Sequence, residues 1–391
     1  MVVAAALAGP GQAVANAQVA AAADEQLPPT PGPVSPEQTN PQIFALTQDA
    51  DYALRYSFAA VASDLGRSYA SGTVEADLKA GLLSLPAEKR DPIVAVAKQL
   101  VTASANTRGT QFGRHGALTA DQFRALGFAG AFASAKVDEA ALKSSVNARA
   151  QQLAQEKKAA ETDARNLAQL KQLDLVTVPK LTSLDFRIDR VKAVEETDEI
   201  GDDEIVMAGL TVDSAAVTKK VPLWMVNEDF DTGDQVDYAD PGRLFNRFSL
   251  TGTGGWPRSF VAVVMMAEQD SGGFATAVNS AWTKVSGKVA EKIIQVVGDF
   301  LSEYVGAALG EFLGQVIGYL VGSFVQWVID LFNDDLFDAR TALVKLPHRY
   351  AFMYHDPADL GWTEYRRPTT QMRFVGHGGD YRVNVHWQVN L

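Results

Sequence analysis

Histidine is the residue type in this chain most suited to acid–base or metal chemistry, and its five copies follow no known pattern. They are His115, His348, His355, His377 and His386. None falls in an HExxH or similar metal-binding spacing, and there is no GxSxG elbow for a serine nucleophile. His355 is followed by Asp356, but a surface contact explains such a pair as well as an acid–base role. No recognisable catalytic motif is present, so we predict a protein that is not an enzyme, with an enzyme that has an unfamiliar site as the alternative.

Two further kinds of chemistry are excluded by what the sequence lacks. The glycine-rich run TGTGGW at 251–256 is not followed by the Lys-Ser/Thr of a phosphate-binding loop, so it indicates a turn. Cysteine is absent, which removes disulfides, thiolate metal sites and cysteine nucleophiles. The absence of cysteine fits a cytosolic and an exported protein equally well.

Glycine gives the strongest spacing signal. Five glycines follow one another at intervals of four residues: Gly306, Gly310, Gly314, Gly318 and Gly322. Inside a helix each costs about 1 kcal/mol relative to alanine, and together roughly 4–5 kcal/mol, unless close packing compensates. The same small-xxx-small spacing pairs helices in lipid. One partner cannot cover all five on a helix of 3.6 residues per turn, so we expect two neighbours in a bundle or repeated copies in a homo-oligomer.

The segment that carries this glycine zipper is long and apolar. The 25 residues from Val305 to Ile329 contain Glu311 as their only charge. As a helix they would extend about 37 Å, and a bilayer core is about 30 Å thick. No Lys or Arg occurs from Ile293 to Ala339, which argues against an ordinary membrane anchor. Three interpretations stay open: a helix buried in a soluble hairpin, conditional insertion into lipid, and permanent anchoring.

Charge and composition restrict the partners. The chain has 391 residues, 47% of them hydrophobic, which is enough for a large core in two or three domains. Its net charge of −12 argues against a nucleic-acid partner, since phosphate binding needs a basic surface. Residues 181–240 hold sixteen acidic against five basic side chains, so most of the acid lies in one region.

Changes of pattern along the chain predict three parts. Residues 1–41 are an Ala- and Pro-rich leader without regular structure. Its start resembles a secretory signal but lacks a basic n-region, so we expect export from a bacterium, with a cytoplasmic location as the alternative. Residues 42–178 have helical periodicity, with Thr119 as an N-cap and a long polar helix from Val137 to Leu173.

From residue 179 onwards the pattern alternates with a period of two, which predicts strands. The expected strands begin with Leu184–Ile188 and continue with Ile205–Val212, Val221–Met225, Phe245–Leu250, Ser259–Met266, Ala342–Leu346, Thr370–Val375 and Tyr381–Val389. The fold class is therefore α+β: an N-terminal α-helical hairpin or bundle, followed by an antiparallel β-sandwich over 179–391. A glycine-zipper helical hairpin at 274–333 interrupts the sandwich. Its first helix is amphipathic, with lysines opposite the apolar face.

Three stretches of the sandwich resemble a C2 domain, in which acidic loops bind calcium and face membranes. Residues 183–206 resemble its first strand, acidic loop and next strand; 260–271 and 333–346 resemble the strands around its third loop. The likeness covers 50 residues, and Ile205 and Val206 replace the usual proline and aromatic residue. The resemblance implies Ca²⁺ as a ligand, because hard cations take several carboxylate oxygens. The implied ligands are Asp198, Asp203, Glu204, Glu268, Asp270, Asp334 and Asp335.

These patterns together predict a membrane-active, non-enzymatic protein. We expect a secreted pore-forming toxin or effector that meets lipid through its acidic loops and inserts the glycine-zipper hairpin. The alternative is a soluble binding or structural protein, in which the glycines only allow helices to pack tightly within a monomer or an assembly.

Overall fold

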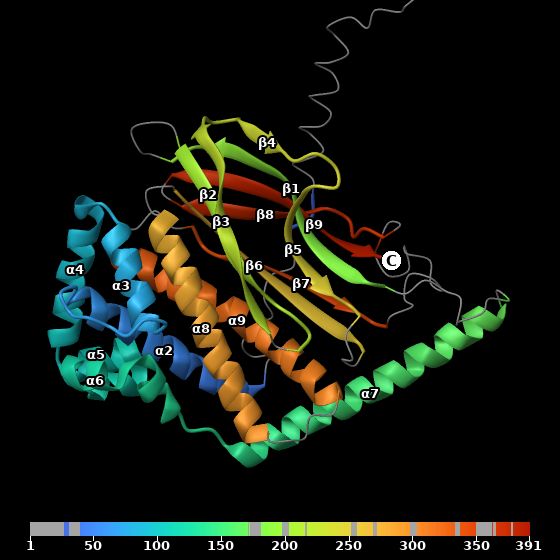
Figure 1. Cartoon of the computed structure of the whole chain (residues 1–391), viewed down its shortest axis with the longest axis horizontal. Coiled ribbons are helices and arrows are strands. Elements are labelled where there is room, and N and C mark those ends of the chain that lie inside the picture. The colour runs from blue at the N-terminus through green and yellow to red at the C-terminus, as the bar shows by residue number, and fades with distance from the viewer. Residues whose placement is uncertain are drawn as a thin grey trace, which may run out of the picture.

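A computed structural model describes most of the chain from Asn40 onwards and a short piece before it (Figure 1). The described residues are 27–30, 40–170, 172, 181–197, 203–215, 217–251, 256–268, 272–297, 303–332, 337–348, 362, 365–376 and 378–391. Within them the fold is mixed: helices come first, and two antiparallel sheets follow. At this level the predicted α+β class is confirmed.

The N-terminal part consists of helices. They are α2 (Pro41–Ala62), α3 (Val74–Ser84), α4 (Ala87–Thr102), α5 (Ala105–Phe112), the 3-10 turn η2 (Gly113–Ala117), α6 (Ala120–Ala133) and α7 (Glu139–Leu170). Local chemistry fixes where they begin. The Asn40 side chain accepts hydrogen bonds from the first amides of α2, and Thr119 forms a capping box with Gln122 at the start of α6. The predicted N-cap at Thr119 is confirmed.

The strands form two sheets. The first, which we call the outer sheet, has the order β4-β1-β9-β8, with β5 also paired to β1; the second, the central sheet, has the order β3-β2-β6-β7. The outer sheet contains β1 (Ser183–Glu195), β4 (Gln235–Asp237), β5 (Arg243–Ser249), β8 (Thr370–Gly376) and β9 (Gly379–Asn390). The central sheet contains β2 (Asp203–Val212), β3 (Thr218–Phe230), β6 (Arg258–Glu268) and β7 (Arg340–Leu346).

The central sheet is covered on both faces, and β6 shows why. All its residues are buried. Phe260, Val264 and their alternate neighbours face the outer sheet in one core, while Val261 and Val263 join the helices in a second core. A strand between two apolar layers needs apolar side chains on both faces, which explains the uninterrupted run of apolar residues in β6.

Two long helices cover the second face of the central sheet. They are α8 (Gly272–Val297) and α9 (Glu303–Phe332), and in chain order they fall between the paired strands β6 and β7. The helix α8 lies along β2 and β3, and α9 lies along β6 and β7. On their far side α2 contacts both, α3 packs beside α8, and α7 crosses α9 (Figure 1). The layers are therefore outer sheet, central sheet, α8 with α9, and N-terminal helices.

A short piece of the leader lies at the edge of the outer sheet. The amide of Gln371 in β8 donates to the Pro28 carbonyl at 3.0 Å, and the amide of Thr30 donates to the Gln371 carbonyl at 2.9 Å. Residues 27–30 thus partly cover the free edge of β8, the kind of edge that proteins protect against pairing with other chains. The remainder of the predicted leader before Asn40 lies outside the described residues.

Candidate functional site: the zipper helix and its contacts

The helix α9 contains all five glycines of the predicted zipper, and their surroundings differ. A Cβ atom added at Gly310 would lie 2.6 Å from the Ser214 carbonyl oxygen, so this glycine lets the loop between β2 and β3 approach the helix backbone. At Gly306 and Gly322 an added Cβ would meet nothing within 4 Å. The side-chain surroundings of Gly314 and Gly318 lie outside the described part of α9. One glycine is therefore explained by internal packing, and two are not.

Aromatic rings attach α9 to the neighbouring helices. Phe324 lies 6.0 Å from Phe58 of α2 and 5.7 Å from Trp282 of α8 between ring centroids. Trp327 lies 6.0 Å from the same Phe58 ring and 6.4 Å from Phe112 of α5. These pairs meet edge to face, the geometry that favours aromatic contacts beyond simple burial. Most of the contact between α9 and the N-terminal helices is thus apolar.

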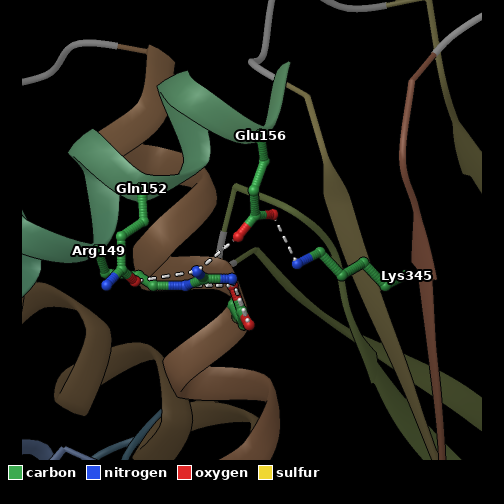
Figure 2. Close-up of polar contacts among 5 residues, drawn as sticks. Arg149, Gln152, Glu156 and Lys345 are labelled. Atoms are coloured by element: carbon green, nitrogen blue, oxygen red, sulfur yellow. Dashed lines mark hydrogen bonds and ion pairs between the residues drawn. The ribbon is translucent and has the colours of Figure 1, made fainter. Parts of the chain in front are cut away.

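A cluster of charged side chains joins α7 to α9. Arg149 of α7 binds both carboxylate oxygens of Glu311, with its Nη2 3.0 Å from Oε1 and 2.9 Å from Oε2. Its Nη1 donates to Glu156 at 2.9 Å, and Lys345 of β7 donates to the other oxygen of Glu156 at 3.0 Å. Figure 2 shows Arg149, Gln152 and Glu156 projecting from α7 toward one another, with Lys345 reaching in from the strand. We call Arg149, Glu156, Glu311 and Lys345 the α7 clamp.

The clamp is partly shielded from water. Arg149 and Glu311 are 18% and 16% exposed, and Leu153 packs beside them on Ala307 and Ala308 of α9. Burial works against the charge of Arg149, but the Glu311 carboxylate outweighs it and raises the pKa of the guanidinium. Burial alone would raise the pKa of Glu156, but hydrogen bonds from Lys345 and Arg149 lower it. The shifts in pKa favour the charged forms of Arg149 and Glu156, and the only charged side chain between Val305 and Ile329 is paired with a side chain of another helix.

A second polar contact joins α2 to α9. Arg55 forms an ion pair with Asp51 one turn before it, at 2.7 Å, and its Nη2 also donates to the Ser323 hydroxyl at 2.7 Å and the Ser323 carbonyl at 3.2 Å. The guanidinium lies 5.5 Å from the ring centroid of Trp327, within cation–π range. We call Asp51, Arg55 and Ser323 the α2 latch.

The helix α8 is fixed to the central sheet by a buried amide. The Nδ2 of Asn279, whose side chain is fully buried, donates to the Gly209 carbonyl at 2.7 Å and to the Val221 carbonyl at 3.2 Å. The register between β2 and β3 shifts at Gly209, where a Cβ would lie 2.1 Å from the Val263 carbonyl oxygen. Asn279 thus supplies donors where the strand pairing is irregular.

We expect the substitution Asn279→Ala to destabilise the protein by about 2–3 kcal/mol, since it leaves two buried carbonyls without this donor. Urea denaturation followed by circular dichroism measures the loss. The matched control is Ser280→Ala on the next residue, whose hydroxyl contacts the half-buried Lys220 and should cost below about 1 kcal/mol. Equal losses for the two variants would contradict the anchoring role of Asn279.

Two of the predicted calcium ligands, on strands of the central sheet, lie beside the same threonine side chain. Asp203 and Glu268 are both buried, and the Thr197 hydroxyl lies 2.7 Å from Asp203 Oδ1 and 2.9 Å from Glu268 Oε1. The Thr197 amide and the Tyr381 hydroxyl donate to Asp203 Oδ2. Burial and the neighbouring carboxylates, that of Asp203 first, raise the pKa of Tyr381, so its hydroxyl stays protonated as the donor. The Thr197 hydroxyl thus lies between the two carboxylates.

The other predicted ligands do not extend this pair. Glu204 is exposed, whereas its neighbour Asp203 is buried. Asp198, Asp270, Asp334 and Asp335 lie outside the described residues. Within the described ranges, no three histidine or carboxylate side chains are placed to hold a metal ion. The calcium site stays a prediction.

The histidines are placed as follows. His355 and Asp356, the pair noted in the sequence, lie outside the described residues, as does His377. His386 is buried on β9, with its Nδ1 2.9 Å from Asp189 Oδ2 on β1, and Arg366 donates to the same oxygen at 2.9 Å. This pair could not be predicted from local patterns, because its members are 197 residues apart.

The residues that hold α9 were also missed by sequence reasoning. Arg149 is 162 residues from Glu311, and Arg55 is 268 residues from Ser323. An arginine on a helical surface has no feature that identifies so distant a partner. The one available signal was Glu311 itself, because an isolated charge in an apolar helix needs a counter-charge when it is buried.

In the part of the chain that the structure describes, no helix is both long and apolar enough to cross a membrane. No protein-family model, curated protein or solved structure matches the chain.

Proposed function

We propose that this protein is a non-enzymatic membrane-active protein, a pore-forming toxin or effector that inserts α8 and α9 into lipid and associates through the glycines of α9. The observation that carries the proposal is the pairing of Glu311 with Arg149. In α9, the only charged side chain between Val305 and Ile329 is paired with a side chain of α7. Held in this way, α9 stays buried until α7 moves.

The remaining contacts of α9 support the same proposal. Lipid tails are as apolar as leucine side chains, so the apolar face of α9 would exchange protein for hydrocarbon at little cost. The polar contacts to α2 and α7 are exchanged less easily. Their partners Arg149 and Arg55 would need water or anionic headgroups in place of Glu311 and Ser323. The α7 clamp and the α2 latch are therefore the contacts that would control release.

We further propose that the acidic end of the sandwich meets the membrane, as the resemblance to C2 domains implies. Asp203 and Glu268 would anchor the loops that carry the remaining predicted calcium ligands. Calcium would neutralise these loops, which otherwise repel an anionic surface. The two antiparallel sheets support this proposal only at the level of general architecture.

The alternative function is that of a soluble binding or structural protein whose glycines only allow helices to pack tightly within a monomer or an assembly. Gly310 favours it, because the Ser214 carbonyl occupies the space that a side chain would need. Asn279 favours it too, since its hydrogen bonds hold α8 on the central sheet. In this alternative α8 and α9 never leave the sheet.

Dye release from anionic liposomes distinguishes the two functions. The full chain is added to phosphatidylserine-containing vesicles, with Ca²⁺ in one arm and a chelator in the other. We expect release in the calcium arm. Release in both arms would keep the membrane function and reject the calcium step. Absence of both release and vesicle binding would reject the membrane function in favour of the packing role.

A further inference from the structure

The α2 latch contains a buried ion pair that is incompletely satisfied. Asp51 is 3% exposed, and only its Oδ2 atom has partners, Arg55 at 2.7 Å and the Ser323 hydroxyl at 3.5 Å. Its Oδ1 atom is buried without a hydrogen-bond partner, and so is the Nε atom of Arg55. An ionised carboxylate with one unsolvated oxygen is costly, and a neutral one is less so.

Few other charges act on Asp51. Arg55, on its own helix, is the charged group that favours its ionised form, and from α9 only the Ser323 hydroxyl does so. Among the described residues, the helices α3 to α8 around α2 supply no charge that acts on it. Two residues earlier, Asp49 has its own partner in Arg114, with His115 3.2 Å away. The protonation of Asp51 therefore depends mainly on its burial between α2 and α9.

We propose that Asp51, Arg55 and Ser323 form a pH-dependent latch between α2 and α9, which holds the zipper helix more tightly in acid than at neutral pH. We call the contact between α2 and α9 at Asp51 the seam. When α9 separates from α2 and the seam opens, water reaches both oxygens of Asp51, and the cost of burying its charge disappears. A proton on Asp51 thus favours the closed seam. One consequence rests on the proposed function: acid does not trigger the release of α9 into lipid through the α2 latch.

The direction of the pH effect follows from the pKa of Asp51 with the seam closed and with the seam open. Burial outweighs the attraction of Arg55 and raises the pKa in the closed seam to about 6, from the ordinary value of 3.8. A group that binds its proton more tightly in the closed state stabilises that state fully below pH 3.8, and the stabilisation is lost as the pH rises through 6. The opening constant is the equilibrium constant for separation of α9 from α2. The two pKa values predict that it increases about tenfold between pH 5.0 and 7.5.

Hydrogen exchange of the full chain without lipid tests the latch. Exchange of peptides from 303–332 is measured by mass spectrometry at pH 5.0 and 7.5 and corrected for the intrinsic exchange rate at each pH. We expect the opening constant of α9 to rise about tenfold in the native chain. In Asp51→Asn, and in Asp51→Ser should the first variant not fold, we expect no rise.

The matched control is Asp91→Asn, which removes a carboxylate that is 71% exposed and should keep the tenfold rise. An opening constant that does not change with pH in the native chain would overturn the proposal, whatever the variants do. So would a full rise in the Asp51 variants. Because no lipid is present, failure of this experiment leaves the membrane function standing, and failure of dye release leaves the latch standing.

Discussion

Reversing the charge of Arg149 is expected to loosen α7 from α9 and to destabilise the protein by about 3 kcal/mol. The substitution Arg149→Glu leaves Glu311 without its counter-charge and adds a third carboxylate beside Glu311 and Glu156. Breaking a buried pair costs about 3–5 kcal/mol, and the partial exposure of this pair places the effect at the lower end. Denaturation midpoints in urea, followed by circular dichroism, measure the loss.

The effect of Arg149→Glu can be separated from general damage to α7 by restoring the pair in reverse. In the double variant Arg149→Glu/Glu311→Arg we expect at least half of the lost stability to return, because opposite charges again face each other. Arg165→Glu is the matched control, since Arg165 is an exposed arginine on the same helix and should have an effect within about 0.5 kcal/mol. A double variant less stable than Arg149→Glu would contradict the clamp.

The α7 clamp also connects stability with the proposed function. If α7 keeps α9 from lipid, Arg149→Glu should permeabilise anionic vesicles faster than the native chain while being less stable. In the alternative function, the same variant loses stability and gains no activity. The two readouts together show whether the ion pair regulates release or only supports packing.

Much of the secondary structure could be predicted from the sequence, because it depends on local patterns. Each of the eight predicted strands lies within or overlaps an observed one, and β4, with only three residues, was missed. The long polar helix predicted from Val137 to Leu173 is α7, which runs from Glu139 to Leu170. Periodicity and capping residues carry this information within short stretches of chain.

The arrangement of the layers could not be predicted in the same way. The sequence pattern predicted a strand at Ser259–Met266, but not that α8 and α9 would cover one face of it. The glycine spacing indicated close approach by a helix, whereas Gly310 is approached by the loop at Ser214. Such contacts depend on where distant segments meet, and a single sequence contains no local record of that.

The candidate site was predicted in part. The glycines marked α9 correctly as an unusual helix, while Arg55 and Arg149, which hold it, gave no signal. Of the seven predicted calcium ligands, Asp203 and Glu268 share Thr197 and Glu204 points to solvent. The acidic pattern is therefore partly explained by hydrogen bonds that Asp203 and Glu268 accept within the described strands and the adjoining residue Thr197.

Replacing Gly306 and Gly322 with leucine is expected to abolish vesicle permeabilisation while leaving the fold intact. Both glycines are partly exposed, and an added Cβ at either would meet nothing within 4 Å, so the packed protein has room for it. Leucine also favours a helix over glycine by roughly 0.5–1 kcal/mol at each position, so the double variant should be at least as stable as the native chain. Helices that associate in lipid through these glycines would be held apart by the new side chains.

The matched control is Gly287→Leu on α8, an exposed helical glycine that also has open space around it but lies outside the zipper. It should gain similar stability per site and keep full dye release. If the double variant permeabilises vesicles as well as the control does, the glycines of α9 have no role in lipid association. If it unfolds instead, Gly306 and Gly322 serve internal packing, as Gly310 does. Loss of release from a stable double variant is the outcome that the membrane function predicts, because the new side chains would stand where copies of α9 meet in lipid.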